Sequence, residues 1–278
     1  MNQLTRHSIR LEGCRPTPLS SYLKALGILR IVARQVDEQA RGWWEHDAFW
    51  LRSTLDPDAL TTFFLEEYRP SPILAPWNGG SGFYSTDNRK AIEAIERSTA
   101  ERFAPYRQVI ALCRDTLQAL GLTAKPTEDK FRLLTTCRNT WPDDALVWLD
   151  AAFLLTADAA KYPPLLGTGG NDGRLEFTNN LMQRLVELID PESGAARESS
   201  PPQLREVLFD AISAARTKNS IGQFDPSAAG GANSSAGFEG ESNVNNWNFV
   251  LTLEGACVFA SAMVKRLESA SPGTMAFP

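Results

Sequence analysis

The chain has 278 residues, of which 43% are hydrophobic, so it can bury a sizeable core in one large domain or two packed ones. Its formal net charge of -5 argues against a simple basic nucleic-acid binder. No stretch approaches the ~20 apolar residues that a membrane span needs. The polar start at 1–10 is not followed by the apolar segment of a signal peptide, so we expect a cytoplasmic protein without membrane contacts.

Charged residues are distributed unevenly. Residues 1–34 carry six basic side chains against Glu12 alone, and residues 101–140 carry a second basic excess. This segregation is compatible with basic contact faces on an acidic body, and equally with ordinary solvated helix faces.

The four cysteines lie far apart without a Cys-x-x-Cys pair, and the chain has only two histidines. A structural zinc site needs four such ligands at close spacing. We therefore expect reduced, mostly buried thiols, no metal site and no bound cofactor.

The first elements are predicted from periodicity. A short extended segment is expected at His7–Leu11, and apolar residues at helical spacing predict a helix from Pro18 to Gln39. The aromatic-rich stretch Gly42–Ser53 is typical of a hairpin, and a further helix is expected from Pro57 to Tyr68. Six tryptophans are expected in the core: Trp43, Trp44, Trp50, Trp141, Trp148 and Trp247.

Helices dominate the rest of the chain. Asp87 is expected to cap a helical region that is broken at Pro105 and closed by Gly121. Residues 130–138 are ambiguous between helix and strand. Further helices are predicted at residues 143–158, 177–190, 202–216 and 247–268. We expect an α+β fold, helix-dominated, with a small β element near the N-terminus and three long glycine-rich loops. Its organisation is one domain or two packed lobes, 1–140 and 141–278.

The three glycine-rich loops are Pro76–Phe83, Gly167–Arg174 and Lys218–Asn246, and each precedes a predicted helix. Glycine lets a backbone approach a ligand closely, helix N-termini favour anions, and amide side chains suit base edges. Tight turns are the alternative, because Gly and Asn are also the usual turn residues. The nucleic-acid interpretation assigns contacts to these loops and to nearby cations: Asn78, Gly79, Gly80, Ser81, Phe83, Lys161, Gly169, Gly170, Asn171, Arg174, Arg216, Lys218, Gln223, Phe224, Asn233 and Ser234.

Aromatic residues inside the loops have two interpretations. Trp77, Phe83, Phe224 and Phe238 either stack on nucleic-acid bases or anchor their loops onto the body of the protein. The sequence leaves both open.

Known catalytic motifs fail when compared letter by letter. The run Gly79–Phe83 lacks the last glycine of a nucleophile elbow, and Asp172 stands where a dinucleotide fingerprint needs glycine. The chain has no Gly-Lys-Ser/Thr phosphate loop. We therefore predict a protein that is not an enzyme and has no catalytic residue. A metal-dependent nuclease that uses Asp225, Glu239 and Glu241 is kept as an alternative.

Four motifs in order resemble one known family. They are LEGC (11–14) with PTPLSSYLKALG (16–27), APWNGGSGF (75–83), LGTGGNDG (166–173), and GQFDP (222–226) with GGAN (230–233) and GFEGES (237–242). Together they resemble the N-terminal portion of the Csx-seventeen family, the large subunit of type I-G (formerly I-U) CRISPR effector complexes, or Cascades. Members of that family are considerably longer, so we expect their C-terminal remainder to be absent from this chain.

The resemblance implies a DNA- and RNA-binding subunit of an antiviral defence complex. By analogy with other guide-RNA systems, base pairing reads the target while protein reads a short flanking motif. The large subunit is then expected to recognise the protospacer-adjacent motif (PAM) on duplex DNA, assist R-loop formation and recruit the helicase–nuclease. Its implied partners are the CRISPR guide RNA, the target duplex DNA, the backbone repeat subunit, the RNA-processing subunit and the helicase–nuclease. The alternative is a non-catalytic scaffold that binds effector subunits or guide RNA without reading DNA.

Overall fold

The computed structural model describes residues 5–156, 159–163, 165–166, 177–220, 241–264 and 274–276. They divide into two compact units, each continuous in space but not in sequence. Unit 1 comprises the described residues of 1–70, 99–102 and 184–258, and unit 2 those of 71–98, 103–183 and 259–278. These boundaries differ from a division at residue 140, because a helix near the C-terminus packs against the first helix of the chain.

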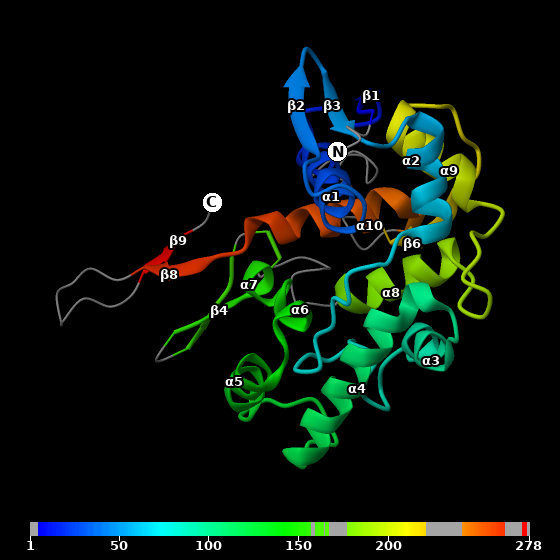
Figure 1. Ribbon diagram of the computed structural model, residues 1–278. Coiled ribbons are helices and arrows are strands. Elements are labelled where there is room, and N and C mark those ends of the chain that lie inside the picture. The colour runs from blue at the N-terminus through cyan, green and yellow to red at the C-terminus, as the bar shows by residue number, and fades with distance from the viewer. Residues whose placement is uncertain are drawn as a thin grey trace. The chain divides into compact units, whose positions relative to one another are not determined.

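A three-stranded antiparallel sheet lies in unit 1 and confirms the small β element near the N-terminus. Its strands are β1 (His7–Leu11), β2 (Arg41–Glu45) and β3 (Ala48–Ser53), in the order β1-β3-β2. A two-residue turn joins β2 to β3, and His46 at this turn has a φ of 54°. The predicted hairpin is therefore present, and it projects beyond the helices of its unit (Figure 1).

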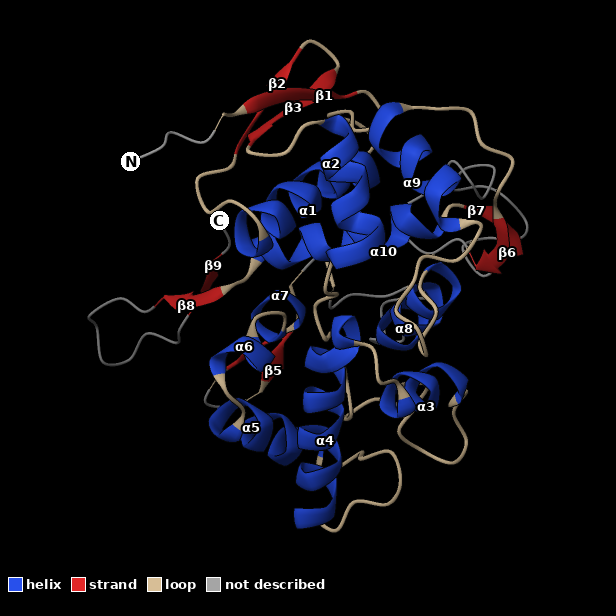
Figure 2. Cartoon of the chain, turned by 45° about the vertical axis from the view of Figure 1, so that its right-hand side comes forward, coloured by secondary structure: helices blue, strands red, loops and turns tan. Residues whose placement is uncertain are grey.

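Helices cover one face of this sheet. Helix α1 (Leu19–Gln35) contacts β2 and β3, and α9 (Ser200–Phe209) contacts β1. Behind them, α10 (Asn246–Ala256) packs against α1 and α9, and α2 (Pro57–Thr62), which continues into the π-helical turn η1 (Phe63–Glu67), packs against α9. Figure 2 shows the sheet lying over α1 within this unit. The Asp56 side chain caps α2 by accepting a hydrogen bond from the Ala59 N–H at 2.8 Å, as Asp-Pro at a helix start favours.

Two glycines allow α1 and α10 to approach closely. A Cβ atom on Gly27 would lie 2.1 Å from the Leu251 carbonyl oxygen, and one on Gly255 would lie 1.8 Å from that of Leu23. Both distances are far inside van der Waals contact, so the helix crossing requires glycine at each position.

A buried ion pair joins the same two helices. The Arg30 guanidinium on α1 donates to the Glu254 carboxylate on α10, and their side chains are only 9% and 2% exposed. The Tyr68 hydroxyl donates to the other Glu254 oxygen at 2.7 Å. Burial alone would lower the pKa of Arg30, but the attraction of Glu254 outweighs it and the pKa is raised.

Helix α1 ends four residues before the predicted end at Gln39. The N–H groups of Val36 and Asp37 both bond to the Val32 carbonyl, which closes the helix. The Asp37 carboxylate then accepts from the Arg6 guanidinium at 2.6 Å and from the Thr54 N–H at 3.2 Å. Long-range partners that the periodicity does not reveal thus fix this end.

Unit 2 is built mainly from helices. They are α3 (Lys90–Arg97), α4 (Ala104–Ala119), α5 (Lys130–Thr140), α6 (Asp143–Leu146) and α7 (Leu149–Ala152), while α8 (Phe177–Leu188) runs across the unit boundary. The ambiguous segment at 130–138 is therefore helical. The predicted helix 143–158 divides into two short helices and a strand.

Three small hairpins complete the described chain. They pair β4 (Leu154–Leu155) with β5 (Ala160–Lys161), β6 (Thr217–Ser220) with β7 (Glu241–Val244), and β8 (Ala262–Val264) with β9 (Thr274–Ala276). The predicted helix 247–268 is wrong over residues 257–264, and its last four residues lie outside the described part of the chain. A 3-10 turn follows α10, and the Ser261 N–H then donates to the Asp150 carbonyl at 2.9 Å.

The fold class is thus confirmed as α+β and helix-dominated. Among the described residues, no helix is both long and apolar enough to cross a membrane.

Candidate nucleic-acid interface

The register of the N-terminal sheet places arginines and tryptophans on one face. Arg10 of β1 lies opposite Trp50 of β3, which in turn lies opposite Trp43 of β2. The next row places Arg52 of β3 opposite Arg41 of β2. Since alternate strand residues share a face, all five side chains project from the same side of the sheet.

The other face of the sheet is buried against the helices. Ile9, Leu11, Phe49 and Leu51 are at most 3% exposed. Gly42 on this face leaves room for the Phe49 ring, whose nearest atom would lie 2.2 Å from a Cβ added at that glycine. Burial of this apolar face fixes the register, and so directs the arginines and tryptophans outward.

The two tryptophans form an aromatic surface on the open face. The rings of Trp43 and Trp50 are nearly parallel, with 7° between their planes and 6.1 Å between their centroids. Trp43 is 38% exposed and Trp50 is half-buried. The prediction that Trp43 and Trp50 belong to the core is therefore wrong, because both project from the solvent side of the sheet. Trp44 is half-buried against Tyr22 and Phe49, whereas Trp141, Trp148 and Trp247 are buried as predicted.

The open face has an excess of positive charge. Arg10, Arg41 and Arg52 are exposed. Of these three, only Arg10 has an ion-pair partner among the described residues, Glu12 at 3.0 Å. Arg41 donates to the neighbouring Ala40 carbonyl at 2.8 Å. Glu45 is the acidic residue of β2 on the same face. Three guanidinium groups and two indole rings are the groups that bind phosphates and stack on bases.

The basic segment at 1–34 contributes less to this surface than its charge suggests. Arg6 pairs with Asp37, Arg15 with Asp210 at 3.0 Å, and Arg30 with the buried Glu254. Both partners of each of these ion pairs belong to unit 1. Most of the local excess is thus neutralised by acids from distant segments.

The first glycine-rich loop is organised around Asp87 in unit 2. The Asp87 carboxylate accepts hydrogen bonds from the N–H groups of Gly80 and Gly82, both at 2.9 Å, and of Tyr84 at 3.2 Å. Gly80 and Gly82 have φ values of 77° and 93°, which favour glycine. The predicted role of Asp87 as a helix cap is wrong, since the carboxylate binds the preceding loop and α3 begins three residues later.

This loop is folded into unit 2. Trp77 is fully buried and stacks on Trp148 at 5.6 Å, and Phe83 is 8% exposed beneath the Arg114 guanidinium. Anchoring of the loop is therefore the structural role of both aromatics. Asn78 and Ser81 are buried as well, while Gly79 and Gly80 are partly exposed. Buried side chains reach a nucleic acid only if the loop rearranges.

The other predicted contact residues are placed as follows. Lys161 lies exposed on β5 in unit 2. Arg216 and Lys218 lie exposed in unit 1, where Arg216 pairs with Glu206. The remaining predicted residues lie outside the described part of the chain: Gly169, Gly170, Asn171, Arg174, Gln223, Phe224, Asn233 and Ser234.

A polar network fixes the hairpin β6–β7. Asn246 donates to Glu187 at 2.8 Å and to Thr217 at 3.1 Å, and its N–H donates to the Gln203 side chain at 2.7 Å. Asn245 caps α10 by accepting from the Trp247 N–H at 3.0 Å. Both asparagines are buried, so they act within the fold.

A signal for the open sheet face exists in the sequence. Arginine and tryptophan alternate with apolar residues in Arg41-Gly-Trp43 and in Trp50-Leu-Arg52. Such alternation is typical of a strand with one solvent face. The expectation that Trp43 and Trp50 belong to the core does not take this pattern into account.

Asp225 and Glu239, two candidate metal ligands of the nuclease alternative, lie outside the described part of the chain, as does the side chain of Glu241. In the ranges the structure describes, no three histidine, cysteine, aspartate or glutamate side chains are grouped to hold a metal ion. All four cysteines are buried and unpaired with one another. Burial raises the pKa of Cys14 to about 11 and those of Cys137 and Cys257 to about 12, which keeps the thiols protonated.

Comparison with known proteins finds no match to this chain, either among protein-family models or among curated proteins.

Proposed function

We propose that this chain is the non-catalytic large subunit of a guide-RNA-directed DNA surveillance complex, and that it contacts nucleic acid through the open face of its N-terminal sheet. The resemblance of its four ordered motifs to the Csx-seventeen family supports the first part. The proposal includes PAM recognition, assistance in R-loop formation and recruitment of the helicase–nuclease in the cytoplasm.

The observation that carries the proposal is the clustering of five side chains on one open sheet face. Arg10, Arg41 and Arg52 surround the paired rings of Trp43 and Trp50. The exposed part of this aromatic pair, chiefly Trp43, is costly to leave in water. Arginine adds phosphate contacts and stacks on bases, whereas a surface with only a folding role has no need of three clustered cations.

The net charge of -5 is compatible with this proposal. A negatively charged body repels nucleic acid at long range, so the isolated chain is expected to bind weakly. In an assembled complex, other subunits and the guide RNA position the strand, and a local basic face is then sufficient.

The test is reconstitution with the other effector subunits, guide RNA and a fluorescent target duplex with randomised flanks. The double variant Arg41→Ala/Arg52→Ala is compared with Arg89→Ala/Arg97→Ala, which removes the same charge from the surface of unit 2. We expect all three complexes to assemble and only the sheet variant to lose nucleic-acid affinity, by tenfold or more.

Two outcomes contradict the proposal. Failure of the wild-type chain to associate with the effector subunits would show that the family resemblance is misleading. Assembly with equal affinity for both double variants, and with no preference among flanks, would instead favour the scaffold role.

A further inference from the structure

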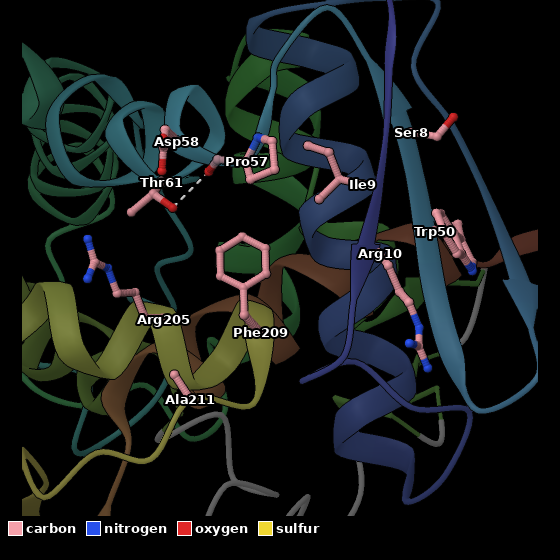
Figure 3. Close-up of a pocket in the computed structure, with 10 residues that line it drawn as sticks. All are labelled: Ser8, Ile9, Arg10, Trp50, Pro57, Asp58, Thr61, Arg205, Phe209 and Ala211. Carbon is pink, nitrogen blue, oxygen red and sulfur yellow. Dashed lines mark hydrogen bonds between the residues drawn. The ribbon is translucent and has the colours of Figure 1, made fainter.

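An open cavity of about 630 Å³ continues from the sheet face around the edge strand β1. Arg10 and Trp50, which belong to the open face, also line this cavity. Figure 3 shows Arg10 and Trp50 on one side of β1, and Ile9 on the other side directed toward Phe209. The cavity is therefore an extension of the face already described. We call it the β1 groove.

Helix α9 supplies the far wall of the β1 groove. Arg205 and Phe209 are four residues apart, so they project from the same side of the helix. Arg205 is exposed and, among the described residues, has no ion-pair partner, and Phe209 is half-buried. The groove thus has a guanidinium group and an aromatic ring among its lining residues on α9 as well as on the sheet.

Helix α2 supplies the third wall. The Thr61 hydroxyl donates to the Pro57 carbonyl at 3.0 Å, and Asp58 is the acidic residue lining the groove (Figure 3). Arg10 is paired with Glu12, whereas Arg205 has no ion-pair partner among the described residues, so two arginines stand against Asp58 and Glu12. A phosphate that enters the groove meets the Arg205 guanidinium and can compete with Glu12 for Arg10. Apolar atoms of Ile9 and Pro57 line its floor.

The exposed rings favour unpaired bases over a duplex. In a duplex the faces of the bases are covered by neighbouring base pairs, so tryptophan and phenylalanine cannot stack on them. A single strand exposes both base faces and its phosphates, and proteins that bind single strands combine aromatic platforms with a basic groove in this way.

We propose that the sheet face and the β1 groove form one continuous path for a single-stranded nucleic acid, with bases on Trp43 and Trp50 and the next nucleotide between Arg205 and Phe209. This inference rests on the proposed function and specifies its ligand. The sheet is three strands wide at about 4.8 Å per strand. A single-stranded nucleic acid that crosses the sheet and enters the groove therefore occupies few nucleotides. Its expected site size is near the short end of the ~4–16 nucleotides that compact single-strand binding domains cover.

The test measures binding of the full chain to fluorescein-labelled oligothymidylates of increasing length by anisotropy at low salt. Trp43→Ala is expected to weaken every length by about 5- to 150-fold, since one stacking platform is lost. Arg205→Ala and Phe209→Leu are expected to weaken only the longer oligonucleotides, which reach the groove. Arg205→Ala should also reduce the slope of log affinity against log salt by about 0.7.

Arg97→Ala is the matched control, because it removes the same charge from a side chain that is 77% exposed in unit 2. It should leave affinity and salt slope unchanged. Circular dichroism checks whether Phe209→Leu is folded. If that variant is unfolded, the test rests on Arg205→Ala, because the Arg205 side chain is exposed.

Distinct results overturn this inference and the proposed function. Duplex binding as tight as single-strand binding, or wild-type affinity of Arg205→Ala at every length, refutes the continuous path while the sheet-face proposal stands. Wild-type affinity of Trp43→Ala refutes both. Strand β1 is an edge strand, to which an extended peptide could also bind. If an extended acidic peptide displaces the oligonucleotide from the wild-type chain but not from Arg205→Ala, the groove is a peptide site instead.

Discussion

The substitution Glu254→Gln tests the buried ion pair that links α1 to α10. It removes the charge that compensates Arg30 and keeps the size of the side chain. Both partners are almost fully buried, with 9% and 2% of their side chains exposed. Breaking such a pair from one side costs roughly 3–5 kcal/mol, because the remaining charge stays buried without compensation.

This loss of stability is measurable as a lower melting temperature. Each kcal/mol lowers the melting temperature of a domain of this size by about 2–4 °C, so a loss of about 3 kcal/mol predicts a fall of roughly 6–12 °C. Differential scanning calorimetry, with urea titration followed by circular dichroism, provides the measurement.

The matched control is Asp210→Asn, which removes one carboxylate from the exposed pair with Arg15. Those two side chains are 58% and 59% exposed, and such pairs contribute less than about 1 kcal/mol. A second variant, Arg30→Met/Glu254→Leu, should recover much of the lost stability, since both charges are removed together. A melting temperature for Glu254→Gln equal to that of Asp210→Asn would refute this account of the helix contact.

Three further predictions concern other parts of the fold. Gly255→Ala should lower the free energy of unfolding by roughly 1–3 kcal/mol or more, since its Cβ would lie 1.8 Å from the Leu23 carbonyl oxygen. Gly121→Ala has room for its Cβ and only the strain of a φ of 69°, so it should cost about 1 kcal/mol; equal urea midpoints would contradict this. Asp87→Ala should accelerate hydrogen exchange of the Gly80, Gly82 and Tyr84 amides selectively, because it removes their acceptor; unchanged exchange would show that the loop holds without it. The buried cysteines should make stability fall as pH rises above about 9, because unfolded thiols ionise there while Cys14, with a pKa of about 11, stays protonated in the fold. Replacing Cys14 with alanine should flatten that part of the pH–stability curve, and an unchanged slope would contradict the assignment.

The sequence predicts local elements well where one face is apolar. The alternation in Gly42–Ser53 indicated the hairpin, and the helical spacing after Pro18 indicated α1. It does not reveal which face of the hairpin stays open. That depends on α1 covering only one side of the sheet, and on α10 packing against α1 from more than 200 residues away.

The candidate site was predictable only in part for the same reason. Asp87 before a helix has the position of an N-cap, yet its carboxylate turns back to amides five and seven residues upstream. Trp77 and Phe83 in a glycine loop suggest base stacking, yet neighbouring helices bury them. Tertiary contacts therefore bury the aromatic residues of the loop Pro76–Phe83, whereas Trp43, which was predicted in the core, lies at the surface.

The most direct test of the central claim is ultraviolet cross-linking of the reconstituted complex, followed by trypsin digestion and mass spectrometry. Trypsin cuts after Arg41 and Arg52 and so releases residues 42–52, which include Trp43 and Trp50. We expect nucleotide adducts on this peptide in the wild-type complex and their loss in the Trp43→Ala complex. Efficient cross-linking elsewhere in the chain, with none on residues 42–52, would contradict it.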